Sequence, residues 1–478
     1  KDGPARQVWG GLLAVTVLAV DAGTTTVRCV AVDGDGRPVG EERLSLPPAN
    51  PAPGLVEFDA LVLAEAVMGM ATEVLERHGP VDGVGIASQR ASAVAWDRST
   101  GQPVGPGIGW QDLRTVARCG ELRAEGVPVA PNQSATKFEW LMGESRATGR
   151  ADLCLGTVDS WLAWVLTCGK AHVTDLTNAA ATGLLALDGS WDVALLDCLS
   201  IPASSLPEVV GSAGVVTAAS VLPGAPPISA LAGDQQASLI GLGCVSVGQT
   251  KLTAGTGAMV DMCTGDVAGT GADGCYPMPA WATPDGVAWM LEGAVLSAGS
   301  AVAWLVDLGV VPDVASSHAL ASGCEDSGGV VFVPALSGLG TPTWDDGARG
   351  TLLGVTRGTG RAEICRAVLE GVAHCCADVI EVLARTSGTK PTSVRMDGGM
   401  SANPTFVQSL ADASGIVVER SSELEATALG AAALVRVATG DATDPTDAMK
   451  GWQPAELVGP RGPVDRDRWA EAVSRARP

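Results

Sequence analysis

One short segment near the N-terminus combines the residue types that bind and stabilise phosphate groups. It contains Asp21, Thr24, Thr25, Thr26 and Arg28. A carboxylate can hold hydrated Mg²⁺, threonine hydroxyls and backbone N–H groups can bind phosphate oxygens, and an arginine can offset developing negative charge. The segment therefore predicts a phosphate-binding turn, although a threonine-rich turn can also be purely structural.

The sequence contains no convincing example of the common glycine-rich nucleotide-binding motifs. The only Gly-Lys pair is Gly169-Lys170, and because Ala171 follows it there is no P-loop. A G-x-G-x-x-G string occupies residues 269–274, but it follows a polar segment and precedes Cys-Tyr-Pro-Met-Pro instead of a helix. We interpret that string as a coincidence.

The surrounding patterns alternate between strand and helix. Residues 13–20 and 27–33 are β-rich runs on either side of the Asp21 turn, which predicts a β-hairpin. Residues 59–78 predict a helix, residues 81–87 a buried strand, and residues 362–385 a core-facing helix with apolar positions at helical spacing. This alternation is typical of an α/β fold.

A second turn of similar composition occurs later in the chain. Ala254, Gly255, Thr256 and Gly257 follow the strand-like run 249–253, and another strand-like run comes after them. Two similar hairpins predict two related domains that flank a cleft. We expect a flexible leader at 1–11, an N-terminal domain at 12–243, a C-terminal domain at 244–443 and a peripheral tail at 444–478.

Composition narrows the class of partner. The 478 residues include 31 Lys and Arg against 53 Asp and Glu, a formal net charge of −22, and 46% are hydrophobic. Such an acidic chain repels phosphate backbones and anionic lipid, so we expect a small-molecule partner and no nucleic acid. The apolar run 12–20 is too short to span a bilayer, which predicts no membrane insertion.

The twelve cysteines are scattered and form no C-x-x-C pair, which argues against a zinc site or a dithiol redox motif. We therefore expect a reducing, cytoplasmic environment. Cys375 and Cys376 lie behind His374 in a helix-like apolar run, where they are interpreted as packed thiols.

A series of ordered strings resembles one protein family from about residue 16 to about residue 440. They include VDAGTTTVR, GLVEFD, GIASQR, GWQDLRT, GTVDSWLAW, HVTDLTNAAAT, LAGDQQASLIG, TAGTGAMV and MDGGMSANPTFVQSLAD. The chain is similar to the FGGY carbohydrate kinases and, among them, most resembles the glycerol kinases. This resemblance implies an α/β fold of two actin-like (ribonuclease H-like) domains, as in the sugar kinase, heat-shock ATPase and actin superfamily.

The resemblance also implies the roles of individual residues. Asp234 matches the family's general base, which takes the proton of the attacking hydroxyl, and Asp21 and Asp234 match acids that organise Mg²⁺. The substrate side matches Arg90, Trp110, Asp234 and Gln235. The ATP side matches Thr24, Thr25, Thr26 and Arg28 in the first hairpin, Gly255, Thr256 and Gly257 in the second, and Gly299, Gly399 and Asn403 beside the adenosine. The Gly398-Gly399 turn, which comes just before Asn403, could also be only the start of a helix.

The substrate side departs from the glycerol kinase pattern at three positions. Ala91 stands where those kinases have a glutamate, Asn132 where they have a tyrosine, and Met259 where they have a phenylalanine. Loss of the carboxylate removes charge-assisted hydrogen bonds of about 1.5–3 kcal/mol each. A longer polyol or a ketose could fill the larger pocket, with Asn132 supplying hydrogen bonds, or neighbouring residues could compensate for glycerol.

These observations predict an ATP- and Mg²⁺-dependent kinase that phosphorylates a primary hydroxyl of a small polyol or sugar, with glycerol the nearest substrate. The alternatives are a kinase for a longer polyol or ketose, of the erythritol, xylulose or ribulose type, and a nucleotide-dependent binding protein with weakened catalysis. A homodimer or homotetramer is typical of the family.

Overall fold

The structure is a computed structural model that describes residues 15–147, 152–186, 188–422 and 425–478. The predicted leader at 1–11 lies outside these residues. The described chain forms two compact units. The N-terminal unit contains the residues up to Gly241 together with Pro279–Val287 and Thr427–Lys450, and the C-terminal unit contains Leu242–Met278, Ala288–Ala426 and Gly451–Pro478.

The main sheet of the N-terminal unit has the strand order β11-β12-β5-β1-β2-β3. These strands are Ala213–Ala218, Pro227–Gly233, Gly83–Ser88, Val15–Ala22, Thr26–Asp33 and Pro38–Ser45. Strands β1 and β2 form the predicted antiparallel hairpin, in which Asp21 pairs with Arg28. Strand β5 runs parallel to both β1 and β12, and Ser88 at its end is in register with Ala22 and Gly233. Three strands therefore end at the same edge.

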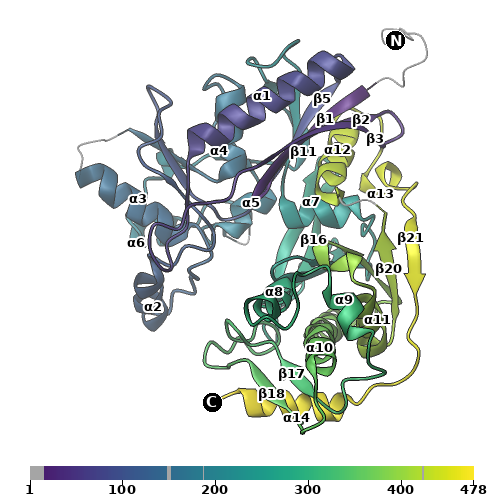
Figure 1. The fold of residues 1–478 in the computed structure, drawn as a ribbon. Coiled ribbons are helices and arrows are strands. Elements are labelled where there is room, and N and C mark those ends of the chain that lie inside the picture. The colour runs from purple at the N-terminus through teal and green to yellow at the C-terminus, as the bar shows by residue number, and fades with distance from the viewer. Residues whose placement is uncertain (1–14, 148–151, 187, 423–424) are drawn as a thin grey trace. The chain divides into compact units, whose positions relative to one another are not determined.

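Helices cover both faces of this sheet (Figure 1). Helix α1 (Ala60–His78) begins at its N-cap Asp59 and packs on β1 and β2. Val84 and Ile86 of β5 belong to the same core as α1, whereas Gly83 and Gly85 alternate to the other face and contact α12 (Ala426–Ala438). A β-carbon on Gly85 would lie 2.7 Å from the carbonyl oxygen of Ala431, so these glycines allow α12 to approach closely.

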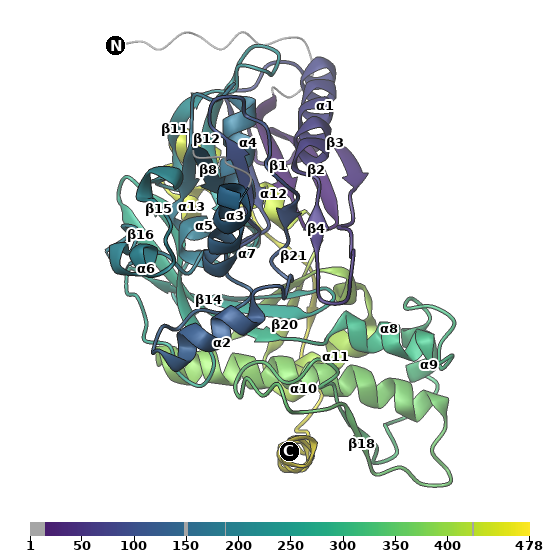
Figure 2. The same ribbon diagram turned by 90° about the vertical axis from the view of Figure 1, so that its left-hand side faces the viewer.

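The rest of the N-terminal unit is built around a second core, which contains Phe138, Leu155 and Leu184. Figure 2 shows α2, α3 and α6 in this part of the unit. Its strands pair as β4 with β7, β6 with β8, and β9 with β10: Glu57–Phe58, Gly107–Ile108, Val94–Asp97, Leu153–Gly156, Val173–Asp175 and Glu208–Val210. The helices are α2 (Val116–Ala124), α3 (Ala135–Ala147), α4 (Val158–Leu166), α5 (Leu176–Ala181), α6 (Val193–Cys198), η1 (Ala203–Ser205), α7 (Asp234–Gly241) and α13 (Pro445–Ala448).

A seven-stranded sheet of order β15-β16-β14-β13-β19-β20-β21 belongs to the C-terminal unit, except that Pro279–Val287 of β15 and β16 are assigned to the N-terminal unit. The strands are Tyr276–Thr283, Gly286–Val295, Ala258–Gly265, Thr250–Ala254, Ser393–Asp397, Val417–Ser421 and Pro454–Val458. Strands β13 and β14 form the second predicted hairpin. Strand β19 runs parallel to β13 and β20. This repeats, in the second unit, a hairpin joined to a parallel strand.

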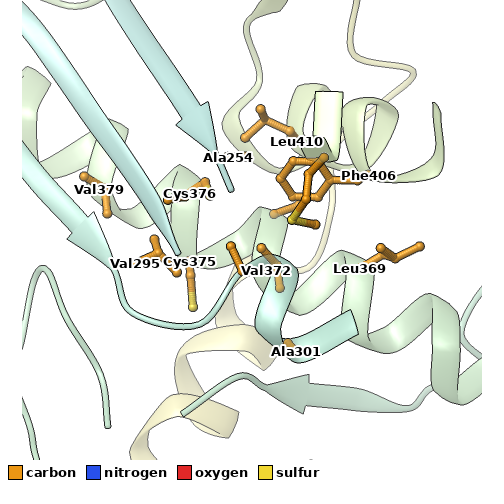
Figure 3. Packing of buried hydrophobic residues seen from close by; sticks show 14 of the residues in the cluster. Ala254, Val295, Ala301, Leu369, Val372, Cys375, Cys376, Val379, Phe406 and Leu410 are labelled. Atoms are coloured by element: carbon orange, nitrogen blue, oxygen red, sulfur yellow. The ribbon is translucent and has the colours of Figure 1, made fainter. Parts of the chain in front are cut away.

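The core of the C-terminal unit is built around the long helix α10 (Arg361–Ser387), which packs against α11 (Pro404–Ser414). Figure 3 shows Val372, Cys375, Cys376 and Val379 of α10 among the buried side chains of this core. Both cysteines are free thiols, as predicted. The remaining elements are α8 (Gly299–Asp307), α9 (Ser317–Ala321), β17 (Val331–Val333), β18 (Thr351–Leu353), η2 (Gly399–Ala402) and α14 (Arg466–Ala476).

Several element predictions are confirmed within one to three residues at their ends. They are the two hairpins, helix α1, strand β5 and helix α10. The G-x-G-x-x-G string at 269–274 lies in the connection between β14 and β15, and no helix follows it. The segment 444–478 differs from the expected peripheral tail because β21 joins the sheet and Trp469 of α14 is 3% exposed in the core. The prediction was wrong because the segment is rich in charged residues and proline overall, while one face of α14 is apolar and buried.

No described helix is long and apolar enough to cross a membrane.

A glycine-to-alanine pair tests the close packing of α12. A β-carbon on Gly430 would lie 1.7 Å from the carbonyl oxygen of Ala237 in α7, so Gly430→Ala should lower the free energy of unfolding by about 1–3 kcal/mol. Gly69 in α1 has no neighbour within 4 Å of such a carbon, so Gly69→Ala should raise it by roughly 0.5–1 kcal/mol. Urea unfolding of both variants measures these changes, and equal effects would contradict the packing argument.

Candidate active site

The first hairpin turn brings an acid and an arginine to the shared edge of the sheet. Asp21 is 6% exposed, and its Oδ2 lies 3.3 Å from Nη1 of Arg28. The turn is closed by a hydrogen bond from the N–H of Gly23 to the carbonyl of Thr26, at 3.0 Å. Within the described chain, the N–H groups of Thr24 and Thr25 donate to no protein acceptor. The turn therefore presents free backbone donors beside a buried carboxylate.

A chain of hydrogen bonds joins this turn to Trp110. Gln89 donates from Nε2 to the carbonyl of Gly23 (3.4 Å) and accepts from the hydroxyl of Ser92 (3.0 Å). The same hydroxyl of Ser92 accepts the N–H of Trp110 at 3.0 Å. The indole Nε1 of Trp110 then donates to Oγ1 of Thr24 at 3.1 Å. The predicted substrate tryptophan and the predicted phosphate turn are thus held in one ring of contacts.

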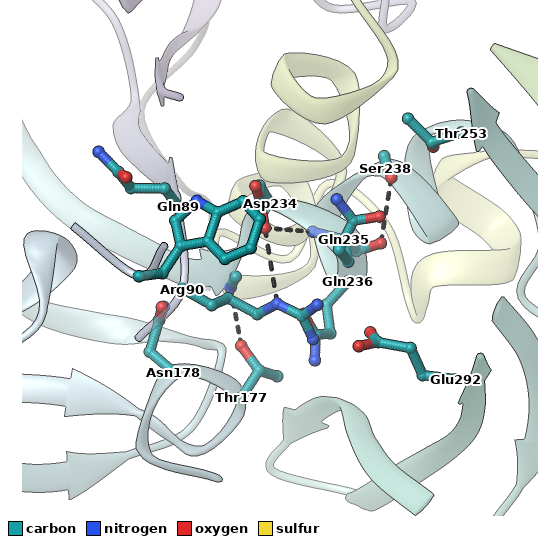
Figure 4. Close-up of polar contacts among 12 residues, drawn as sticks. Gln89, Arg90, Thr177, Asn178, Asp234, Gln235, Gln236, Ser238, Thr253 and Glu292 are labelled. Atoms are coloured by element: carbon teal, nitrogen blue, oxygen red, sulfur yellow. Dashed lines mark hydrogen bonds and ion pairs between the residues drawn. The ribbon is translucent and has the colours of Figure 1, made fainter. Parts of the chain in front are cut away.

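Asp234 stands at the end of β12, as the first residue of α7. Its Oδ1 accepts the N–H of Gln235 at 2.8 Å and lies 3.6 Å from Nε of Arg90. Figure 4 shows the Arg90 side chain extending below both Asp234 and Gln235. The Arg90 side chain is 13% exposed and that of Asp234 27% exposed, so the pair is partly screened and still open to a small ligand.

A buried lysine holds the loops on the far side of Trp110. Nζ of Lys137 in α3 donates to the carbonyls of Trp110 and Gln133, both at 3.1 Å. Lys137 has no exposed surface, and burial lowers the pKa of its ammonium group to about 7; Asp112 and Cys119 oppose this change, while Arg114 adds to it. Asn132 lies exposed in the turn that precedes α3.

Position 91 has a backbone conformation that side-chain-bearing residues rarely adopt. Ala91 has φ +60° and is 5% exposed, immediately after Arg90. A non-glycine residue in this region is uncommon and is held there by its surroundings. The turn at 89–92 is therefore a fixed feature that sets the direction of Arg90.

The C-terminal unit assembles a second set of glycines. The turn at 255–257 is contacted by the start of α8: Gly299 donates its N–H to the carbonyl of Gly255 (2.9 Å), and Ser300 donates to that of Thr256 (3.0 Å). A β-carbon on Gly299 would lie 2.6 Å from the oxygen of Gly255, and one on Gly398 would lie 2.5 Å from that of Ala254. These approaches require glycine.

The remaining predicted adenosine residues lie next to this turn in the same unit. Gly399 is exposed and opens η2. Asn403 caps α11, because its Oδ1 accepts the N–H of Phe406 (3.1 Å) while its Nδ2 donates to Ser317 (2.9 Å). The helix-start interpretation therefore accounts for the contacts of Asn403 in this structure. Met259 follows the turn on β14.

Each hairpin by itself has backbone donors that fit a phosphate group. In the described residues, the N–H of Thr256 has no protein acceptor either, and its side chain is exposed. Unpaired N–H groups in a tight turn form an anion-binding concavity. The described chain contains no cluster of three or more metal-ligating side chains.

Sequence reasoning missed the residues that support the candidate side chains. Gln89 and Ser92 lie on either side of Arg90 in the string QRAS, Lys137 comes five residues after Asn132, and Thr177 lies in the string HVTDLTNAAAT. Their closeness in sequence to predicted site residues or to the family strings was the one signal that could have pointed to them. Their hydrogen bonds join segments that are distant in sequence, so no local pattern could reveal them.

The family follows from comparison with known proteins. Residues 16–241 match the N-terminal domain of the FGGY family of carbohydrate kinases, and residues 251–439 match its C-terminal domain. The chain belongs to the FGGY family of carbohydrate kinases. It has the two-domain sugar kinase fold of the actin-like ATPases, and its activity is that of a carbohydrate or polyol kinase that uses ATP.

Several of the similar proteins are named glycerol kinases. The chain is 39% identical to a glycerol kinase of Rhodospirillum rubrum, over 96% of this chain and 98% of that protein. It is 40% identical to a glycerol kinase of Trichlorobacter lovleyi, over 95% and 96%. Its structure is similar to that of Plasmodium falciparum glycerol kinase with ADP, with a TM-score of 0.88, 28% identity and coverage of 98% and 99%.

The buried lysine gives a pH-dependent prediction for stability. Because the pKa of Lys137 is lowered to about 7 in the folded protein from an ordinary value of 10.5, the unfolded chain binds more protons between these values. Stability conferred by the wild-type residue should therefore rise with pH, by at most about 1.4 kcal/mol per pH unit, relative to Lys137→Met.

Denaturant unfolding at pH 6, 7.5 and 9 tests this difference. The control is Lys170→Met, which makes the same substitution at an exposed position and is measured in parallel. If the difference in free energy of unfolding between the wild type and Lys137→Met does not change with pH, the prediction that the Lys137 ammonium group makes stability depend on pH is wrong.

Proposed function

We propose that this kinase transfers the γ-phosphoryl group of ATP to a primary hydroxyl of glycerol, forming glycerol 3-phosphate and ADP. The observation that carries the proposal is the near-complete alignment, at about 40% identity, with proteins named as glycerol kinases. The pairing of Arg90 with Asp234 at the edge of the sheet supports it. The same resemblance supports a cytoplasmic enzyme that assembles as a homodimer or homotetramer.

In this proposal Asp234 is the general base. Its carboxylate accepts the proton of the attacking hydroxyl, and its position at a strand end leaves it open to a small polyol. Arg90 orients Asp234 and donates hydrogen bonds to a substrate hydroxyl. The Trp110 indole covers the carbon chain, and Gln235 and Asn132 contribute polar groups. Holding the hydroxyl close to its base is the main contribution of these residues to rate.

The hairpin residues would hold the phosphates. Thr24, Thr25, Thr26 and Arg28 of the first hairpin would bind phosphate oxygens, as would Gly255, Thr256 and Gly257 of the second. Gly299, Gly399 and Asn403 border the adenosine, with Asn403 contributing as the helix cap that fixes the turn. Asp21 and Asp234 would hold Mg²⁺. When bound, ATP supplies the phosphoryl group, and Mg²⁺ offsets phosphate charge.

A kinase for a longer polyol or a ketose is a second candidate, and three positions favour it. Ala91 offers no carboxylate, Asn132 is exposed and polar, and Met259 replaces a rigid aromatic side chain with a flexible one. Together they leave more space and different hydrogen-bonding groups. A pocket built for particular hydroxyls rejects analogues that lack them, so substrate length is a sensitive test.

Replacement of the proposed base separates catalysis from binding. Asp234→Asn keeps the shape of the side chain and removes its basicity, so kcat should fall by about 10²–10⁴-fold while the affinity for nucleotide stays within about twofold. A coupled ADP-release assay and nucleotide titration measure the two quantities. Asp285→Asn, an exposed aspartate in the same unit, should change neither. Retained turnover in Asp234→Asn would refute the assignment.

A substrate panel decides between the two candidates. With MgATP and glycerol, dihydroxyacetone, erythritol, ribitol, xylulose or ribulose, we expect kcat/KM to be highest for glycerol. A higher value for a longer substrate would assign specificity to Ala91 and Asn132 instead. No stimulation of ADP release by any of them would favour the binding-protein alternative.

A further inference from the structure

A buried polar cluster lies behind Asp234, on residues to which the family resemblance assigns no role. Its centre is Asp175, which is fully buried and caps α5. Five donors surround its two oxygens: the N–H and hydroxyl of Thr177, the N–H and side-chain amide of Asn178, and the hydroxyl of Ser212. Burial raises the pKa of the Asp175 carboxyl, and these hydrogen bonds oppose that increase.

One arm of this cluster reaches the residue directly before the proposed base. The hydroxyl of Thr177 donates to Oδ1 of Asp175 at 2.9 Å and accepts the N–H of Gly233 at 2.8 Å. Because its proton goes to the carboxylate, the oxygen of Thr177 presents a lone pair to Gly233. The N–H of Gly233 is therefore held by a hydroxyl whose own direction is fixed from behind.

Gly233 is also packed against Arg90. A β-carbon at Gly233 would lie 2.7 Å from Cδ of Arg90 and 2.6 Å from Oε1 of Gln236, so the aliphatic stem of Arg90 rests on this glycine. Figure 4 shows Thr177 below Arg90, with its contact toward the end of β12 marked. A shift of Gly233 would move Asp234 through the chain and Arg90 through contact.

A second arm holds the same strand two residues earlier. Ser212 donates its hydroxyl to Oδ2 of Asp175 at 2.7 Å, and its carbonyl accepts the N–H of Leu231 at 3.1 Å. The hydroxyl of Ser212 also accepts the N–H of Ala282 at 3.0 Å. Leu231 and Gly233 both belong to β12, so the cluster holds the end of this strand at two points.

We propose that Thr177, oriented by Asp175, is a positioning residue that fixes Gly233 and thereby the geometry of Asp234 and Arg90. The proposal rests on the proposed function, in which Asp234 is the base. It assigns Thr177 an effect on turnover beyond its contribution to the buried core, and it distinguishes the Thr177 arm, which contacts Gly233, from the Ser212 arm, which does not.

Two substitutions at Thr177 separate positioning from packing. Thr177→Val keeps the shape but removes the hydroxyl, so kcat should fall at least tenfold while KM for nucleotide stays within twofold. Thr177→Ser restores the hydroxyl and should return kcat to within threefold of the wild type. The readouts are steady-state kinetics of the full chain with glycerol, or with whichever panel substrate is best, and thermal unfolding.

Thr167 supplies a matched control in the same unit. It is equally buried, its hydroxyl donates to the carbonyl of Ala163 (2.7 Å), and it accepts the N–H of Ala171 (3.1 Å), but among the described residues it forms no hydrogen bond with β12 or Asp175. Thr167→Val should lower Tm without lowering kcat. Ser212→Ala should likewise keep kcat within threefold, because the contact between Thr177 and Gly233 remains.

The outcomes are distinct. A folded Thr177→Val enzyme with unchanged kcat, or an equal loss of kcat in Thr167→Val, would overturn the positioning role. If Thr177→Val does not fold, Thr177→Ala tests the same link, since it also removes the hydroxyl that accepts the N–H of Gly233. Its kcat should fall in the same pattern, and normal turnover in this variant would overturn the proposal. Retained turnover in Asp234→Asn would instead remove the proposed function itself.

Discussion

The parallel pairing of β5 with β1 and β12 is the constraint on which the candidate site in the N-terminal unit depends. Parallel strands end at the same edge of a sheet, and Ala22, Ser88 and Gly233 are in register there. The residues that follow each strand therefore lie close together. Those residues are the Thr24 turn, the turn that carries Arg90, and Asp234.

Close backbone approach has the corresponding role in the C-terminal unit. Gly299 and Gly398 pack directly on the hairpin that contains Gly255, at distances that a side chain would not permit. The carbonyls of Gly255 and Thr256 accept N–H groups at the start of α8, while the N–H of Thr256 has no acceptor in the described part of the chain. An arrangement of this kind provides donors for an anion while its own acceptors are satisfied internally.

Buried polar groups maintain the arrangement in the N-terminal unit. Lys137 joins the Trp110 loop to the turn before α3, and Asp175 joins α5 to the end of β12 through Thr177 and Ser212. Burying a charged group is costly unless its hydrogen bonds are made, so each of these residues is surrounded by partners. The energetic requirement to satisfy them is what fixes the loops that carry the candidate site.

The sequence by itself determined the α/β class, both hairpins, helices α1 and α10, and the family. These features depend on local periodicity or on ordered strings such as GDQQ around Asp234, which are visible without a fold. Only the tertiary structure decided that Gln89 and Ser92 connect Trp110 to the first turn, that Asn403 caps α11, and that α14 buries Trp469. Each of these depends on hydrogen bonds or burial between segments far apart in the chain, and their partners are set by strand register and helix packing that no local pattern specifies.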